Sequence, residues 1–336
     1  MKVLSLFDGM SCGQIALNRL GIEYDTYYAS EIDKYAIQVA KKNYPNMIHI
    51  GDVTKIKADD FGDEQIDLLL GGSPCQGFSF AGHQLNFEDP RSKLFFEYVR
   101  LLKELKPKYF LLENVKMKKE SRDVISKYLG VEPIEINSAL VSAQKRSRLY
   151  WTNIPNVGQP KDKGLVIKDI LQESVDSKYI LSQKIQDRIQ ITREDVISNP
   201  SIGTTKPEFR TIGQRDVVYG HNQKMGCLVA TDYKQPKQII TKPIRLGHLN
   251  KGGQGDRIYS TDGKGVCLSA NGGGRGAKMG MYMDNLQVRK LTPVECERLQ
   301  TVPDNYTDGV SDTQRYKMLG NGWTIDVITH ILKNIL

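Results

Sequence analysis

One cysteine stands where a side chain could do covalent chemistry. Residues 66–70 are an apolar run typical of a buried strand, and Gly-Gly-Ser-Pro-Cys-Gln-Gly-Phe-Ser follows at 71–79. The glycines and the proline interrupt the run, so we expect Cys75 in a tight turn at the carboxyl end of that strand. Reacting groups gather there in open α/β sheets, and a thiol attacks a substrate once its pKa is lowered. A lone cysteine is more often a buried apolar residue than a nucleophile, so the neighbouring motifs must show which of the two Cys75 is.

A carboxylate and two arginines follow other apolar runs. Glu113 comes directly after the run 109–112, at the expected end of a strand. Gln-Lys-Arg-Ser-Arg at 144–148 leads into Leu-Tyr-Trp, and period-two alternation places Arg146 and Arg148 on one face. The two arginines could form a solvated edge, but the apolar continuation favours side chains that point inward. A thiol, a carboxylate and two guanidinium groups would then meet at neighbouring sheet edges.

The first 55 residues have the pattern of a nucleotide-binding unit. A strand over 3–7, a glycine turn at 8–13 and a helix ended by Gly21 open the chain, although the spacing is not Gly-x-Gly-x-x-Gly. Glu31 follows a second strand, where a ribose is usually bound, although a solvated loop carboxylate fits equally well. Asp52, in a third strand over 49–53, would suit an adenine amine. Asp33 should cap a helix over 34–43.

Composition limits the class of protein. The chain has 336 residues, which indicates two domains, and a net charge of +8, which favours a polyanionic partner without proving one. Five scattered cysteines form no Cys-x-x-Cys pair, which argues against a disulfide framework or a metal site. We expect no signal peptide, because Asp8 interrupts the first apolar run, and no apolar run is long enough for a membrane span. We therefore expect a cytoplasmic protein.

The texture of the sequence changes between about residues 155 and 290. This region is rich in Gly, Lys, Gln and Thr, which predicts a smaller, loop-rich β domain. It contains a repeat at a spacing of 40 residues: 214–219 aligns with 254–259, and 224–230 aligns with 264–270. A duplicated structural hairpin explains this repeat as well as a second recognition loop does. Helical texture returns with a capping box at 292–295 and an amphipathic end at 325–336, which should pack beside the first strand.

These motifs, in their order, resemble those of the DNA (cytosine-5)-methyltransferase family over nearly the whole chain. The resemblance is carried by Phe7–Gly13, Glu31, Asp52, Pro74–Gln76, Glu113–Val115, Gln144–Arg148, Arg289–Glu295 and Gly320–Gly322. It implies a Rossmann-like core with a mixed, mostly parallel sheet and helices on both faces, over residues 1–175 and 305–336. A target-recognition domain would span 176–304. Ser11, Cys12, Cys267 and Gly322-Trp323 depart from the usual family residues.

The resemblance also implies roles for single residues. Cys75 would attack C6 of a flipped-out cytosine, Glu113 would contact N3 and the exocyclic amine, Arg148 would hold O2, and Arg146 would support the Cys75 loop. The cofactor S-adenosylmethionine would be bound by Phe7, Asp8, Gly9, Met10, Ser11, Cys12, Glu31, Ile32, Asp52, Val53, Pro74, Leu94, Asn321 and Trp323. The DNA would be contacted by Gln76, Ser79, Arg91, Gln254, Arg257, Tyr259, Ser269, Gly272 and Gly273.

The implied partner is double-stranded DNA, bound by a monomer encoded by a bacterium or a phage. Residues 247–274 resemble the recognition loops of a bacterial family member that methylates GCGC, so a target containing CG, with GCGC favoured, is expected. A cognate restriction endonuclease would be a functional partner, not a stably bound one. The alternatives are a cytosine-5 methyltransferase acting on transfer RNA and a catalytically silent DNA-binding protein. A plain Rossmann oxidoreductase would leave the Pro-Cys-Gln and Gln-x-Arg-x-Arg motifs unexplained.

Overall fold

The computed structural model describes most of the two ends of the chain and the strands of its middle. The described residues are 1–62, 64–73, 90–180, 201–204, 217–219, 238–239, 245–248, 257–261, 264–268, 281–284, 287–289 and 291–336. Within these ranges, the side chains of residues 90–92, 201–248, 260 and 281–288 are not described.

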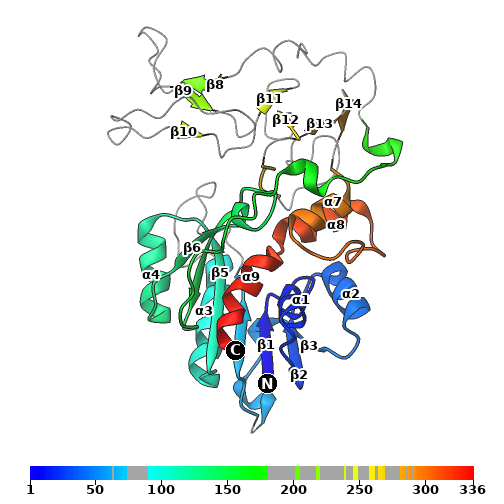
Figure 1. Ribbon diagram of the computed structural model, residues 1–336. Helices are drawn as coiled ribbons and strands as arrows, with labels where there is room; N and C mark the ends of the chain where they lie inside the picture. Colours follow the sequence, from blue (N-terminus) through cyan, green and yellow to red (C-terminus); the bar gives the residue numbers. More distant parts are fainter. Residues whose placement is uncertain are drawn as a thin grey trace.

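A seven-stranded sheet forms the centre of the larger part (Figure 1). Its strands are β1 (Lys2–Leu6), β2 (Thr26–Ser30), β3 (Ile48–Gly51), β4 (Leu68–Gly71), β5 (Tyr109–Val115), β6 (Ile134–Asn137) and β7 (Ser147–Thr152). Their order in space is β3-β2-β1-β4-β5-β7-β6. The first five strands are parallel, and β7 runs antiparallel to both β5 and β6. The expected mixed, mostly parallel sheet is confirmed.

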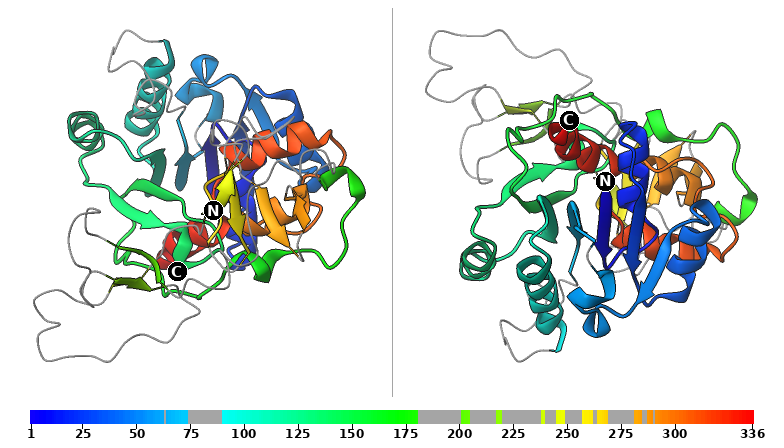
Figure 2. Two further views of the ribbon diagram at one scale, coloured as in Figure 1. Left: turned by 90° about the horizontal axis from the view of Figure 1, so that it is seen from above. Right: turned by 90° about the horizontal axis from the view of Figure 1, so that it is seen from below.

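Helices cover both faces of this sheet (Figure 2). They are α1 (Cys12–Arg19), α2 (Lys34–Asn43), α3 (Pro90–Leu105), α4 (Lys119–Leu129), α7 (Pro293–Leu299), α8 (Asp312–Asn321) and α9 (Ile325–Leu332). Alternation along the strands divides the core into two hydrophobic clusters. Val3, Leu68 and Leu70 pack with α1, α2 and α7–α9, whereas Leu4, Leu6 and Leu69 pack with α3 and α4.

Local sequence signals explain where several helices begin. The Asp33 side chain accepts hydrogen bonds from the backbone N–H of Tyr35 (2.9 Å) and Ala36, so the predicted cap of α2 is confirmed. Thr292 and Glu295 form the predicted capping box of α7. The third strand ends at Gly51, earlier than expected, because Asp52 caps a short 3-10 turn over Val53–Lys55.

The C-terminal helix closes the larger part next to its beginning. Helix α9 lies beside α1, and Arg19 of α1 pairs with Asp326 of α9. The Arg19 guanidinium also donates to the Thr301 carbonyl oxygen at 2.9 Å. Val3 shares a hydrophobic cluster with Ile325 and Ile328, as expected for a terminal helix near the first strand.

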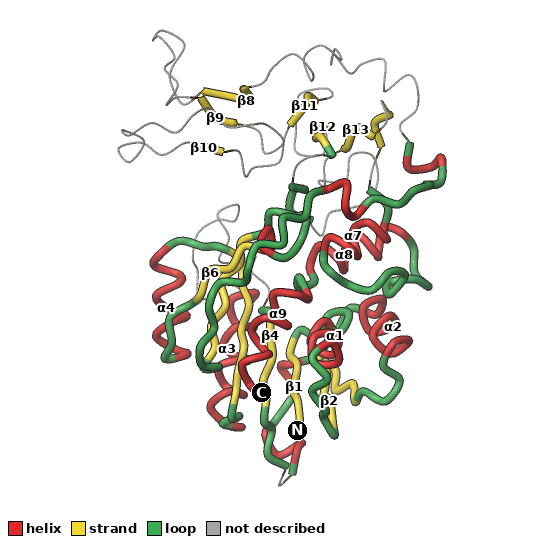
Figure 3. Tube along the Cα trace, viewed as in Figure 1, coloured by secondary structure: helices red, strands yellow, loops and turns green. Residues whose placement is uncertain are grey.

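The middle of the chain forms two small sheets. Strands β8 (Ser201–Thr204), β9 (Val217–Tyr219) and β10 (Gln238–Ile239) make one in the order β10-β9-β8. Strands β11 (Arg245–His248), β12 (Arg257–Ser260), β13 (Met281–Asp284) and β14 (Gln287–Arg289) make the other in that order. Residues 153–180 lead toward this region mainly as loop with 3-10 turns (Figure 3). In the part of the chain that the structure describes, no helix is long and apolar enough to cross a membrane.

Candidate active site

The carboxyl ends of β4 and β5 bring two of the predicted motifs together. Ser73 follows β4, and its hydroxyl accepts a hydrogen bond from the Asn114 amide at 3.2 Å. Asn114 lies in β5 directly after Glu113, so the acidic motif is joined to the segment that leads to the cysteine. Cys75 itself, with Pro74, Gln76 and Ser79, lies outside the described residues.

Glu113 faces Arg148 across the antiparallel pair β5–β7. Register pairs Glu113 with Tyr150 and Val115 with Arg148. The Glu113 Oε1 and Arg148 Nε atoms are 2.9 Å apart, and both side chains are largely buried. Apart from this ion pair, Nε is a buried atom without a hydrogen-bond partner among the described residues. Burial lowers the pKa of Arg148, but Glu113, Cys267 and Tyr150 together outweigh burial and raise it, so the guanidinium stays charged.

Arg146 joins three segments that are distant in sequence. Its guanidinium donates to the carbonyl oxygens of Gly320 (3.2 Å), in the last turn of α8, and Gly322 (3.0 Å), directly after α8. It also donates to the Leu268 carbonyl oxygen at 3.2 Å. Arg146 therefore joins the segment at Leu268 to the C-terminal end of α8. Its expected support of the Cys75 loop stays a prediction, because that loop is outside the described residues.

Cys267 places a thiol against both arginines. Its Sγ lies 3.4 Å from Arg146 Nη1 and 3.9 Å from Arg148 Nη2. Burial alone would raise the pKa of this thiol, but the two guanidinium groups outweigh burial and lower it. The other described cysteines differ: burial raises the pKa of Cys12 to about 12 and that of Cys296 well above the ordinary value. Among the described thiols, Cys267 is the one poised to ionise.

A buried amide network holds the Gln-x-Arg-x-Arg element in place. The Gln144 amide donates to the Leu299 carbonyl oxygen and to Gln300 Oε1, both at 2.8 Å. Gln300 in turn donates to the Leu319 carbonyl oxygen at 2.6 Å, and Gln144 accepts from the Leu268 backbone N–H. Sequence reasoning missed Gln300, which is fully buried. A glutamine directly after a short helix gives no local signal of such a role.

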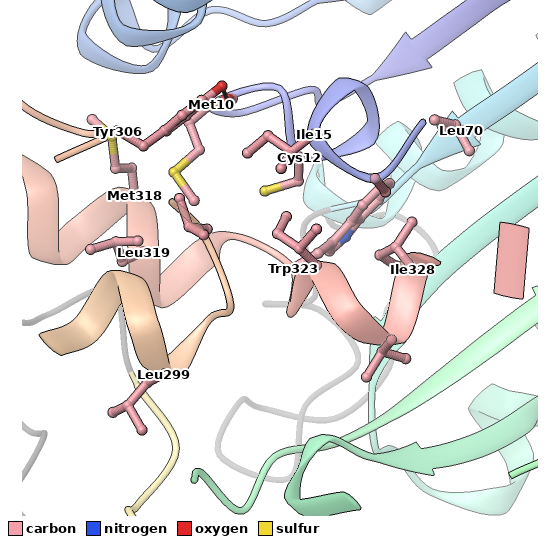
Figure 4. Close-up of a cluster of buried hydrophobic side chains, with 14 of the residues drawn as sticks. Met10, Cys12, Ile15, Leu70, Leu299, Tyr306, Met318, Leu319, Trp323 and Ile328 are labelled. Carbon is pink, nitrogen blue, oxygen red and sulfur yellow. Dashed lines mark hydrogen bonds between the residues drawn. The ribbon is translucent and has the colours of Figure 1, made fainter. Parts of the chain in front are cut away.

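Gly72 and Trp323 lie close to the carboxylate. A Cβ on Gly72 would stand 2.9 Å from Trp323 Nε1 and 3.4 Å from Glu113 Oε2. Figure 4 shows Trp323 beside Cys12 and Ile328, with Met10 pointing toward Met318 of α8. The absence of a side chain at Gly72 therefore lets the indole edge approach the end of β4 beside Glu113.

Acidic residues line the edge formed by β1, β2 and β3. The Glu31 carboxylate accepts backbone N–H bonds from Gly9, Ile32 and Asp33, each 2.8 Å long. Asp52 follows β3 at the same edge, and its Oδ1 accepts from Thr54. Between them, the Ile32 side chain is 77% exposed, which is unusual for a large apolar residue. Two carboxylates beside an exposed apolar side chain fit the ribose and the ring of an adenosine.

Asp8 is a buried acid in the β1–α1 turn. Its Oδ1 accepts a hydrogen bond from the Tyr27 hydroxyl at 2.8 Å, whereas its Oδ2 is buried without a hydrogen-bond partner in the described structure. Burial raises the pKa of this carboxyl to about 6.

Comparisons with known proteins agree with this arrangement. The model of the family "C-5 cytosine-specific DNA methylase" matches residues 1–130 and 136–336. The chain is 32% identical to "Type II methyltransferase M.HhaI" of Haemophilus parahaemolyticus, over 100% of this chain and 94% of the relative. It is 28% identical to "Orphan methyltransferase M.SPRI" of Bacillus phage SPR, over 100% of this chain and 97% of the relative.

The chain belongs to the C-5 cytosine-specific DNA methylase family. It is a DNA (cytosine-5)-methyltransferase, as the motifs predict. The fold agrees: the Dnmt2 methyltransferase of S. pombe superposes with a TM-score of 0.67 at 20% identity, over 100% of this chain and 98% of that one.

The remaining residues expected to bind cofactor in this methyltransferase fall into two groups. Met10, Ser11 and Cys12 are buried in the β1–α1 turn, and Phe7 and Ser11 have positive φ values of 56° and 66°. Val53, Leu94, Asn321 and Trp323 lie after β3, in α3, at the end of α8 and before α9. Asn321 is exposed and Val53 is buried.

Most residues expected to contact DNA lie outside the described part of the methyltransferase. Arg257 begins β12 and is partly exposed, and Tyr259 is buried in the core cluster. Arg91 lies in α3, with its side chain undescribed. The undescribed positions are Gln76, Ser79, Gln254, Ser269, Gly272 and Gly273. Their contacts with DNA stay predictions.

Proposed function

We propose that this enzyme methylates C5 of a flipped-out cytosine in double-stranded DNA through a covalent bond between Cys75 and C6. One observation carries the proposal: the buried ion pair of Glu113 with Arg148 lies at the carboxyl end of β5, where Asn114 is hydrogen-bonded to Ser73, two residues before Cys75. A carboxylate and a guanidinium side by side present both an acceptor and donors to a polar ligand. The polar edge of cytosine offers acceptors at O2 and N3 and a donor at the exocyclic amine.

The proposed chemistry begins with activation of the ring. C5 of cytosine is a poor nucleophile, and addition of the Cys75 thiolate at C6 makes it enamine-like. Glu113 contacts N3 and the exocyclic amine and shares a proton with N3 as charge builds on the ring, while Arg148 holds O2. Once C5 carries the methyl group, loss of the C5 proton to a base restores the C5–C6 double bond and expels the Cys75 thiolate. S-adenosylmethionine, when bound, supplies the methyl group. A ring stacked in a duplex cannot reach the thiol, so the base must flip out.

The edge of β1–β3 supports S-adenosylmethionine as the cofactor. Glu31 is placed to accept hydrogen bonds from ribose hydroxyls, and Asp52 is placed to accept one from an adenine amine. The exposed side chain of Ile32 offers an apolar surface to the adenine ring. We assign residues 1–175 and 305–336 to this catalytic and cofactor-binding function, and residues 176–304 to target recognition.

The proposed target is a short DNA site that contains CG, with GCGC favoured. Arg257, at the start of β12, suits a bidentate contact with guanine O6 and N7. The type II name of the M.HhaI relative supports a role in restriction and modification. In that role a cognate restriction endonuclease would act on the same DNA site without binding stably to this enzyme.

Incubation with labelled S-adenosylmethionine tests the proposal against its rivals. Duplex DNA and transfer RNA are offered separately, and the labelled nucleoside is then identified after digestion. The proposal predicts 5-methyl-2′-deoxycytidine from duplex DNA and no label in RNA. Label confined to RNA would support a transfer RNA methyltransferase, and no label in either would support a silent DNA-binding protein. The Cys75→Ser variant, which retains the fold but not the thiol, is the control.

A further inference from the structure

Cys267 is a thiol that the proposed chemistry leaves unused, although it contacts both arginines of the Gln-x-Arg-x-Arg element. Its Sγ accepts from Arg146 Nη1 at 3.4 Å and lies 3.9 Å from Arg148 Nη2. One sulfur atom therefore lies within contact distance of two guanidinium groups of like charge. Repulsion between two such groups is reduced by a neighbour that can carry a negative charge.

The two guanidinium groups differ in how firmly the rest of the protein holds them. Arg146 is buried, and it donates to three backbone carbonyl oxygens at 3.0–3.2 Å. Arg148 has fewer anchors: its Nε lies 2.9 Å from Glu113 Oε1, and its Nη1 donates to the neighbouring Ser147 carbonyl oxygen at 2.9 Å. Among the described residues, Cys267 is the group that contacts the third nitrogen, Nη2. The orientation of Arg148 thus depends on Cys267 more than that of Arg146 does.

The segment that carries Cys267 is itself bonded to the residues that lead into β7. On one side of Cys267, the Gly265 carbonyl oxygen accepts from the Lys145 N–H at 2.9 Å. On the other side, the Leu268 N–H donates to Gln144 Oε1 at 3.3 Å. These bonds flank the thiol and fix the sulfur relative to both arginines.

The surroundings of Cys267 favour the ionised thiol. Burial raises its pKa, but the two guanidinium groups outweigh burial and lower it. In the described structure, Glu113 of β5 and Tyr150 of β7 act on Arg148 rather than on the sulfur. Lys264, in the same segment, donates its ammonium to two carbonyl oxygens elsewhere. A negative charge on the sulfur strengthens its contacts with both arginines.

We propose that Cys267 is a positioning residue for methyl transfer: its sulfur holds the Arg148 guanidinium in the orientation that meets the flipped-out cytosine. This role rests on the proposed function, in which Arg148 holds O2 of the ring and Glu113 contacts N3. Contacts at both Nε and Nη2 fix the plane of the guanidinium group, which a contact at Nε alone leaves free to turn. A group that binds substrate is most effective when its neighbours lock its rotamer.

The rate of methyl transfer in a single turnover, measured against pH on duplex DNA, tests this role. Attack by Cys75 requires its thiolate, and Cys267 adds a second ionisation in the wild type. The logarithm of the rate should therefore rise with a slope of about 2 on the acid side. Cys267→Ser cannot ionise, so its slope should be about 1 and its rate at pH 8 roughly 10- to 100-fold lower. Its dissociation constants for DNA and S-adenosylmethionine should stay nearly unchanged.

Cys267→Asp is the matched variant, because it keeps a negative charge at the same place throughout the assay range. It should recover most of the wild-type rate with a slope of about 1. Thermal unfolding checks that both variants are folded at the assay temperature.

The outcomes separate the role of Cys267 from the proposed function. The same slope and rate in the wild type and in Cys267→Ser would overturn the role of Cys267 and leave the proposed function standing. Equal losses of rate in the Ser and Asp variants would do the same. A wild type that methylates no duplex DNA would overturn the proposed function, and this role with it.

Discussion

At the residue scale, Cys267 changes the charge around the two arginines. A thiolate there balances one of the two guanidinium groups, and Glu113 balances the other. Cys267 thus adds a pH-dependent contact to a site that otherwise contains permanently charged groups.

Replacement of Cys267 by Ser should remove the thiolate charge beside the two arginines but keep a side chain of similar size there. Because the pKa of Cys267 is lowered on folding, its stabilisation is fully present above the unfolded thiol pKa, about 8.5, and is lost as pH falls through the lowered folded pKa. Melting temperatures of the wild type and Cys267→Ser should therefore differ most at pH 9 and least at pH 6. A difference that does not change with pH would contradict the thiolate.

For the buried carboxyl of Asp8 we expect the opposite dependence of folding stability on pH. Its pKa is raised from 3.8 to about 6, so the stability associated with its proton is present below 3.8 and is lost as pH rises through 6. The shift corresponds to about 3 kcal/mol at neutral pH. In the absence of cofactor, Asp8→Asn should melt several degrees above the wild type at pH 8 and at a similar temperature near pH 4. Equal melting temperatures at pH 8 would show that Asp8 is not destabilising when ionised.

At the scale of elements, the end of β4 must fit against Trp323 and Glu113. Gly72→Ala places a methyl group 2.9 Å from Trp323 Nε1, so the ring or the carboxylate must move. We expect a loss of about 1–3 kcal/mol in stability and at least a tenfold lower turnover. Thermal unfolding and steady-state rates measure the two effects. Gly158→Ala is the matched control, since a Cβ there meets nothing within 4 Å; a Gly72→Ala enzyme as active as this control would refute the fit.

Elements were predictable from sequence wherever a local signal defined them. Asp33 and the Thr292–Glu295 box predicted two helix starts because a cap acts over three residues. The contact of Arg146 with Cys267 joins residues 121 positions apart, and no local pattern encodes it. The contacts of Gln300 and Cys267 therefore appear only once β7, α7 and the segment 264–268 are assembled. The early end of β3 shows the same limit, because the Asp52 cap competes with strand continuation.

At the scale of the whole molecule, residues 201–290 carry a formal charge of +9 and the rest of the chain carries −1. DNA affinity should therefore depend on salt through this segment. Lys234→Gln combined with Lys237→Gln should reduce the slope of log affinity against log salt by up to about 0.9 for each phosphate that is no longer neutralised. Fluorescence titration at several salt concentrations measures it. The control is a double variant in which two exposed lysines of α4, Lys119 and Lys127, are changed to Gln. An equal change of slope in both double variants would argue against DNA binding by residues 201–290.

The central claim is that Cys75 attacks the cytosine. Two thiols compete for this role, because Cys267 is also poised to ionise beside the arginines. Duplex DNA with 5-fluorocytosine in the target site separates them, since fluorine at C5 blocks the final elimination and leaves the attacking cysteine attached. Peptide mapping of the trapped complex should find the adduct on Cys75 in the wild type and in Cys267→Ser, and no adduct in Cys75→Ser. An adduct on Cys267, or trapping that survives in Cys75→Ser, would contradict the mechanism.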